Sequence, residues 1–171
     1  MKKDLTILLV VIAAAVLLFL NVDIKSVDEY YAQNPLNITE DTKACTISVQ
    51  CKDILLHLSA DGSITEKFDS GIILDKTDIA LCENDTVFDV LVRCLKYENI
   101  SFDFSGNPHS KINPAYIIGI DGLNEFDFGK MSGWQYSVNG VSADKSCDQY
   151  ELNDGDTVEF YYVCDYTEVE K

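Results

Sequence analysis

The most constraining feature of the sequence is the stretch Gly129–Cys164, in which two β-type runs are bounded by strong turn signals. Trp134–Val138 and Thr157–Val163 alternate the side chains of two faces, as a pleated strand requires. Between them, Asn139-Gly140 and Asn153-Asp154-Gly155-Asp156 favour the positive φ angles of tight turns. We therefore expect two neighbouring strands near the C-terminal end, and the rest of the chain must supply a covering helix and further strands.

The segment Thr86–Tyr97 has the pattern of an amphipathic α-helix. Thr86 is a good N-cap residue, Asp89 follows three residues later, and Asp85 lies near the positive end of the helix dipole. The apolar residues recur at helical spacing and form a single stripe, which we expect to pack against a sheet. They are Val87, Val90, Leu91, Cys94 and Leu95.

The remaining apolar runs predict strands on both sides of this helix. Cys45–Cys51 alternates cleanly and predicts the first strand, whereas Ser105–Pro114 and Asp121–Lys130 are expected to be loops. The order of elements predicts an α+β fold, in which a mixed sheet of about five strands is covered by one helix in a β-grasp-like arrangement. The other expected strands are Gly71–Leu74, Asp78–Cys82 and Tyr116–Ile120.

The N-terminal end of the 171-residue chain has the pattern of an export signal. Lys2 and Lys3 precede an apolar run over residues 5–20 that is interrupted only by Thr6. No small-residue cleavage site follows, so we expect residues 1–22 to form a signal anchor or transmembrane helix rather than a cleaved signal peptide. Residues 23–43 are expected to be a stalk, 44–166 the domain and 167–171 a tail. The domain would then lie on the extracytoplasmic side of the cell membrane, or be secreted if the leader is cleaved.

The exported part is strongly acidic. The formal charge of the whole chain is −16, and without Lys2, Lys3 and Asp4 it becomes −17. Such a surface repels nucleic acid and anionic lipid, so we exclude both as partners. A solvated acidic surface that keeps the domain soluble explains the charge without an acidic catalytic site.

Six cysteines in an exported domain suggest disulfide bonds. The candidates are Cys147, Cys164, Cys51 and Cys94, and a Cys147–Cys164 bond would close a short loop. Alternatively, the cysteines are small buried hydrophobic residues. The chain has no CxxC motif and only two histidines, so no metal site is expected. The turn chemistry of Asn153-Asp154-Gly155-Asp156 explains its carboxylates without calcium.

Aromatic residues supply the candidate binding surface. Trp134 and Tyr136 share one face of their strand, and Tyr161 lies on the face of the last strand opposite to Phe160 and Tyr162. A platform of this kind could bind a planar ligand or a partner protein. The alternative is that Trp134 and Tyr136 pack inside the domain. The predicted ligand-binding residues are Trp134, Tyr136, Tyr116, Tyr150 and Tyr161.

No motif of a catalytic site is present. His57 and His109 lie outside any GxSxG or HExxH pattern, and no pair of carboxylates stands out in so acidic a chain. We therefore expect a protein that is not an enzyme.

Three segments together resemble a known family. They are Asp85–Leu91, Tyr116–Gly129, and Ser132–Gly140 with Tyr150–Phe160, which contain SGWQYSVNG and LNDGDTVE. Over about Cys45 to Cys164 the chain resembles the bacterial transcobalamin-like C-terminal domains, a family of unknown function. The resemblance implies a β-grasp-like fold and cobalamin as a ligand, because the related domain of the transcobalamins covers one face of vitamin B12. The chain has no room for the helical barrel that holds the other face.

These observations lead to two main functional hypotheses and to a third, more distant one, a hydrolase whose site is not visible in the sequence. The first is a membrane-anchored extracytoplasmic binding module for a corrinoid such as cobalamin, or for a surface protein, with no resident cofactor. The second is a structural or adhesive cell-surface domain with no small-molecule ligand.

Overall fold

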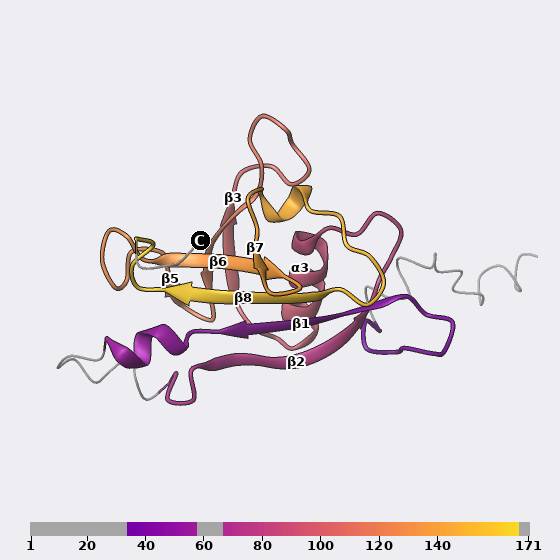
Figure 1. Ribbon diagram of the computed structural model, residues 1–171, viewed down its shortest axis with the longest axis horizontal. Helices are drawn as coiled ribbons and strands as arrows, with labels where there is room; N and C mark the ends of the chain where they lie inside the picture. Colours follow the sequence, from indigo (N-terminus) through magenta and orange to yellow (C-terminus); the bar gives the residue numbers. More distant parts are fainter. Residues whose placement is uncertain (1–33, 58–66, 168–171) are drawn as a thin grey trace, which may run out of the picture.

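The structure is a computed structural model that describes residues 34–57 and 67–167 (Figure 1). These residues form a five-stranded sheet in the order β2-β1-β8-β6-β7, a three-stranded sheet in the order β3-β4-β5, and one α-helix, α3. The prediction of an α+β fold with a five-stranded mixed sheet and one helix is confirmed. The strands of the larger sheet are β1 (Ala44–Gln50), β2 (Ile72–Ala80), β6 (Gly133–Val138), β7 (Val141–Ser142) and β8 (Thr157–Val163).

The last strand, β8, occupies the centre of the larger sheet. It pairs in parallel with β1, so that Ile47 lies opposite Val158, and antiparallel with β6, so that Tyr136 lies opposite Phe160. The alternation that predicted the strands also sets their faces. Phe160 and Tyr162 point into the core, and Glu159 and Tyr161 point to the other side of the sheet.

The edge strand β2 is longer than the sequence predicted. Gly71–Leu74 and Asp78–Cys82 were predicted as separate extended pieces, but β2 runs through Ile72–Ala80 without interruption. The polar residues between the two pieces belong to an edge strand, where outward side chains meet solvent and do not end the strand. Register shifts near Val49 mark an irregularity in the pairing of β1 with β2.

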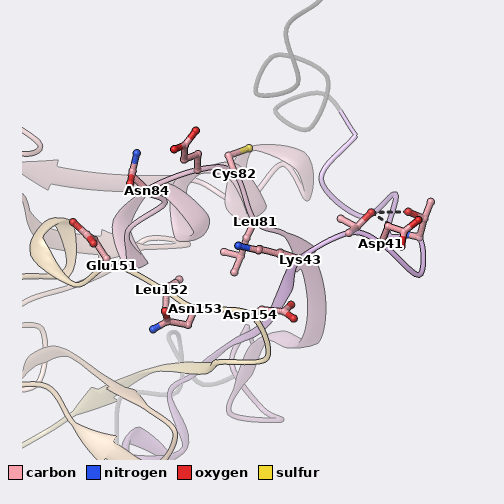
Figure 2. A pocket seen from close by; sticks show the side chains of 12 residues that line it. Asp41, Lys43, Leu81, Cys82, Asn84, Glu151, Leu152, Asn153 and Asp154 are labelled. Atoms are coloured by element: carbon pink, nitrogen blue, oxygen red, sulfur yellow. Dashed lines mark hydrogen bonds between the residues drawn. The ribbon is translucent and has the colours of Figure 1, made fainter.

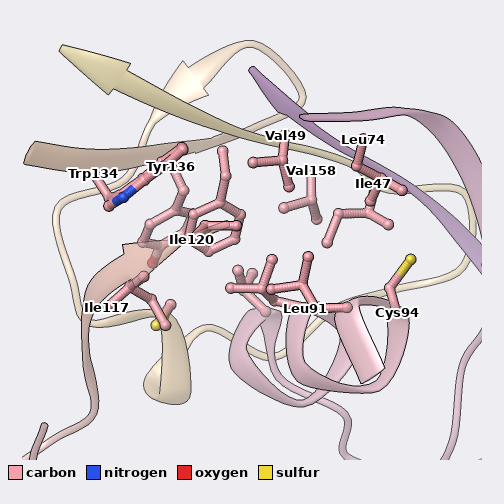
Figure 3. Packing of buried hydrophobic residues seen from close by; sticks show 14 of the residues in the cluster. Ile47, Val49, Leu74, Leu91, Cys94, Ile117, Ile120, Trp134, Tyr136 and Val158 are labelled. Atoms are coloured by element: carbon pink, nitrogen blue, oxygen red, sulfur yellow. The ribbon is translucent and has the colours of Figure 1, made fainter. Parts of the chain in front are cut away.

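Helix α3 (Val87–Tyr97) begins as the sequence predicted. The Thr86 side chain accepts a hydrogen bond from the Asp89 backbone, and the Asp89 carboxylate accepts one from the Thr86 backbone, which completes a capping box. The apolar stripe of the helix faces the larger sheet. Figure 3 shows Leu91 and Cys94 pointing toward Ile47 and Val158 of the strands above them.

The smaller sheet corrects the predicted position of Tyr116–Ile120. This segment is β4, which pairs with β3 (Phe102–Ser105) and β5 (Leu123–Asn124) rather than with the larger sheet. At the turn from β4 to β5, Asp121 and Gly122 both have positive φ angles of 54° and 82°, which is the geometry of a tight hairpin. From the sequence, residues 121–130 were expected to be a loop, of which this turn is a part. Ile117 and Ile120 of β4 complete the core below the larger sheet (Figure 3).

The 3-10 helices η1 (Lys52–Leu56) and η2 (Cys147–Gln149) lie in the connections of the larger sheet. Two turn signals of the sequence are present in the structure. Asn139 and Gly140 have φ angles of 54° and 76° and join β6 to β7, and the turn at Gly155 precedes β8.

The end of the predicted stalk is attached to the domain. The Ala80 backbone donates a hydrogen bond to the Pro35 carbonyl, and Leu81 donates one to Lys43, both at 2.8 Å. Pro35 is buried, so residues 35–43 are part of the folded unit and not a free spacer. The predicted signal anchor lies outside the described residues. Within residues 34–57 and 67–167, no helix has the length and apolar character needed to cross a bilayer.

The contact of α3 with the sheet can be tested with two matched leucine substitutions. Leu91 is fully buried, whereas Leu56 at the end of η1 is 83% exposed. Leu91→Ala should lower the free energy of unfolding by about 2–5 kcal/mol. Leu56→Ala should change it by less than about 0.5 kcal/mol. Denaturant titrations of both variants would measure the difference, and equal effects would contradict the burial of the helix stripe.

The buried thiols predict a loss of stability at alkaline pH. Burial raises the pKa of Cys45 from 9.0 to about 12 and that of Cys94 from 9.0 to about 11. Above about pH 9 the unfolded chain releases protons that the folded chain keeps, so the free energy of unfolding should fall between about pH 9 and pH 12. Cys94→Ala should reduce this slope by up to about 1.4 kcal/mol per pH unit. Denaturant titrations under reducing conditions would measure it, and an unchanged slope would contradict the prediction.

Candidate functional site

The predicted aromatic platform is divided between the core and the surface. Trp134 is 5% exposed and Tyr136 is also buried, so neither side chain can contact a ligand in this structure. The Trp134 indole donates a hydrogen bond from Nε1 to the Leu123 carbonyl at 2.9 Å and packs edge-on against Tyr162 at 5.3 Å between ring centroids. Trp134 and Tyr136 therefore pack inside the domain, which was the alternative to a binding platform.

The other predicted tyrosines lie in separate places. Tyr150 packs edge-on against Tyr136 and beneath the Lys145 ammonium group. Tyr116 is exposed on β4 and donates a hydrogen bond to Glu125. Tyr161 is half-buried on the outer face of the larger sheet. The five residues therefore do not form one surface, and Tyr161 is the one that lies on the outer face of the larger sheet.

The predicted disulfide candidates are thiols in this structure. Cys147 is in η2, packed near α3, whereas Cys164 follows β8 beside Asp53. A bond between Cys147 and Cys164 is not formed, because the two residues belong to different parts of the fold. Cys51 and Cys94 are buried in the core as small apolar side chains.

The outer face of the larger sheet is polar, and no described helix lies over it, although Ser48 and Ser137 are buried among their neighbours. Figure 1 looks onto this face, and α3 and β3 lie behind the strands. Two rows of polar side chains cross the sheet because the strand registers place them side by side. One row is Gln50, Tyr161 and Gln135, and the other is Ser48, Glu159 and Ser137. We call these six residues the polar sheet face.

Hydrogen bonds hold part of the polar sheet face in place. The Gln50 amide donates to the Glu159 carboxylate, and the Tyr161 hydroxyl lies 3.0 Å from the Ser142 hydroxyl of β7. Gln50 Oε1 is buried and has no hydrogen-bond partner among the described residues. A buried acceptor without a partner costs free energy, so a rotation of the Gln50 side chain that exposes this atom to a donor would be favourable.

Two adjoining hollows make a shallow groove along this face. The hollow on the β2 side has a volume of about 430 Å³, the hollow on the β8 side has about 290 Å³, and both are lined by Gln50, Lys52 and Glu159. Tyr161 lines the smaller hollow, and Lys76 lines the larger one. The groove thus presents amide, hydroxyl, carboxylate and ammonium groups on a nearly flat surface.

A larger hollow lies elsewhere, where residues 39–43 lead into β1 (Figure 2). It has a volume of about 760 Å³ and is lined by residues 39, 41–43, 81–84 and 151–154. Its carboxylates include Asp41, Glu151 and Asp154, and the last of these accepts a hydrogen bond from the Ala44 backbone. This hollow holds none of the buried side-chain atoms that lack a partner among the described residues. We therefore describe it as an acidic surface depression in which Asp154 has a structural role through its hydrogen bond with Ala44.

A third hollow lies beside α3, and its polar groups are mostly paired with one another. Arg93 forms an ion pair with Asp85 in which both side chains are nearly buried, and it also donates to the Ala80 carbonyl at 2.8 Å. Asp85 additionally accepts a hydrogen bond from the Cys82 backbone. Arg93 Nε is buried without a partner among the described residues, but the rest of the guanidinium ties the helix to the end of β2. We assign this group a structural role.

The burial of Trp134 can be tested directly because it is the only tryptophan of the chain. Its 5% exposure predicts a blue-shifted emission maximum and acrylamide quenching several-fold weaker than that of free tryptophan. Unfolding in denaturant should shift the emission to the red and remove the protection. Quenching as strong as that of free tryptophan in the folded chain would show instead that the indole is on the surface.

Comparisons with known proteins agree with the sequence motifs. Residues 84–163 match the family model described as Domain of unknown function (DUF4430). The predicted resemblance to a transcobalamin-like domain family of unknown function is confirmed over this part, which extends from the start of α3 to the end of β8. No curated protein matches the chain.

The solved structures that are similar to the chain include the following two. One is haptocorrin in complex with Cbi, with 14% sequence identity and a TM-score of 0.49 over 73% of this chain and 26% of that chain. This chain therefore spans about a quarter of the length of the haptocorrin chain. The other is described as "a putative metal binding protein" from Ruminococcus gnavus, with 18% identity and a TM-score of 0.39 over 70% of this chain and 95% of that chain.

Proposed function

We propose that the chain is an exported binding module, held at the extracytoplasmic side of the membrane by residues 1–22, which binds a corrinoid on its polar sheet face. The observation that carries the proposal is the row of Gln50, Tyr161 and Gln135 on the outer face of the larger sheet, where Gln50 Oε1, at one end of the row, has no hydrogen-bond partner among the described residues. The resemblance of the sequence motifs to the transcobalamin-like domains supports a corrinoid as the class of ligand, because the related domain of the transcobalamins covers one face of vitamin B12.

The chemistry of the polar sheet face suits a flat ligand with amides at its periphery. A corrin ring is a broad, nearly planar macrocycle that carries acetamide and propionamide side chains. Amide groups of this kind both donate and accept hydrogen bonds, and Gln50, Tyr161 and Gln135 offer the complementary groups. Tyr161 also provides an aromatic ring next to the ligand plane.

An open face also limits the strength of binding. Small-molecule sites usually enclose most of the ligand surface, whereas a sheet face contacts only one side of a planar ligand. We therefore propose that this domain holds the ligand weakly by itself, and that a second protein completes the site by covering the other side of the ligand.

An absorbance titration of the full-length chain with cobalamin in detergent would test the proposal. We expect a saturable change in the cobalamin spectrum with a dissociation constant below about 1 mM, which corresponds to about −4 kcal/mol. Tyr161→Ala and Gln50→Ala should each weaken binding at least about tenfold, since each removes a contact worth about 1.4 kcal/mol or more. The matched control is Tyr97→Ala, which removes an exposed tyrosine on α3, away from the polar sheet face.

The titration also separates the two functional hypotheses. No spectral change up to about 1 mM cobalamin would overturn the corrinoid proposal and favour a structural or adhesive cell-surface domain. Equal weakening by Tyr161→Ala and Tyr97→Ala would overturn the placement of the ligand on the polar sheet face.

A further inference from the structure

Three side chains of metal-binding type meet at the end of the larger sheet. Asp53 lies in η1, His57 directly follows η1, and Cys164 directly follows β8. One ligand atom from each residue lies within 4.8 Å of the other two. These residues come from opposite ends of the domain sequence, and the parallel pairing of β1 with β8 brings them together.

We propose that Asp53, His57 and Cys164 bind a divalent transition-metal ion of the zinc class. A carboxylate oxygen, an imidazole nitrogen and a thiolate sulfur are a donor set that Zn²⁺ accepts in proteins. Metal–ligand bonds of about 2.0–2.3 Å require ligand atoms about 3.3–3.8 Å apart in a tetrahedral site. Side-chain rotations that bring the three atoms together by about 1 Å therefore complete three of the four positions.

Contacts around the cluster already hold two of the ligands. Asp53 Oδ2 accepts a hydrogen bond from the Cys164 backbone at 2.6 Å. His57 Nδ1 lies 3.0 Å from the Asp53 carbonyl oxygen and 3.9 Å from Asp53 Oδ1. Such contacts orient metal ligands before the ion binds. The side chains of His57 and Asp53 are 41% and 34% exposed, so an ion can enter from solvent and keep a water molecule in the fourth position.

Cys, His and Asp also occur together in catalytic sites that use a cysteine nucleophile. The environment of Cys164 does not favour nucleophilic catalysis. Burial, and after it the Asp53 carboxylate, raise the pKa of the Cys164 thiol to about 12. A catalytic cysteine needs a thiol that ionises readily. A bound divalent cation supplies the missing positive charge and displaces the thiol proton to solvent, so metal binding and thiol ionisation occur together.

This metal site goes beyond the proposed function and does not depend on it. Asp53 borders the smaller hollow of the groove, so the two sites are neighbours on the same end of the sheet. A metal ion here would also tie η1 to the end of β8, because its ligands come from both elements. Metal binding to the folded chain alone would raise its free energy of unfolding.

Titration with Co²⁺, a spectroscopic substitute for Zn²⁺, would test the site. The full-length chain would be reduced, freed of metal with a chelator and then titrated. We expect one Co²⁺ per chain, with a near-ultraviolet charge-transfer band from a cobalt–thiolate bond that Zn²⁺ abolishes by displacement. Cys164→Ser should remove this band, and His57→Ala should weaken Co²⁺ binding at least about 100-fold, the upper end of the loss seen for supporting residues alone.

The chain offers matched controls for both variants. His109→Ala removes the only other histidine, and Cys147→Ser changes another buried cysteine. Both should keep the charge-transfer band and the affinity, and near-ultraviolet circular dichroism would verify that every variant is folded. The proposal is overturned if the reduced wild-type chain shows no thiolate band, or if Cys164→Ser keeps it.

Discussion

The placement of β8 between β1 and β6 is the constraint on which the rest of the structure depends. Its inward residues Phe160 and Tyr162 contact the aromatic residues of β6, and its outward residues Glu159 and Tyr161 form the middle of the polar sheet face. One strand thus contributes to the core with alternate residues and to the candidate site with the others. A change of register by one residue would exchange the two sets and abolish both.

The interior keeps its large aromatic residues because their polar atoms are satisfied there. Trp134 Nε1 bonds to the Leu123 carbonyl, the Tyr136 hydroxyl to the Lys145 carbonyl, and the Tyr162 hydroxyl to the Asn124 carbonyl. Burying such groups without partners would cancel part of the free energy that their apolar surface contributes. These bonds also tie β6 and β8 to the connections around β5 and η2, so the aromatic residues join the two sheets rather than bind a ligand.

Local patterns in the sequence predicted the helix and strands that carry a clear periodic signal. The capping box of Thr86 and Asp89 and the apolar stripe identified α3, and alternation identified β1, β6 and β8. Alternation also separated Tyr161 from Phe160 and Tyr162. The alternation pattern did not predict which sheet β4 joins or that β2 is continuous. Both depend on contacts between strands that are distant in sequence.

The candidate sites show the same limit more strongly. Trp134 and Tyr161 both looked suited to a platform, and only the position of α3 and the smaller sheet decides which of them is covered. Gln50 could not be identified as a candidate from the sequence. Whether its side-chain oxygen finds a partner among the described residues depends on which residues surround it in the fold. His57 and Cys164 become neighbours through one parallel strand pair, and no spacing motif connects them.

That parallel pair has a consequence for how the protein is made. A ribosome completes β8 after β1 and every other described strand, so the central position of the sheet stays vacant until the rest of the described domain has been made. The α3 segment can form its capped turns meanwhile, but β1 and β6 have no common neighbour to join them. Pairing β1 with β8 across all the residues between them is slow. Until it occurs, the unpaired edges of β1 and β6 can aggregate during biogenesis.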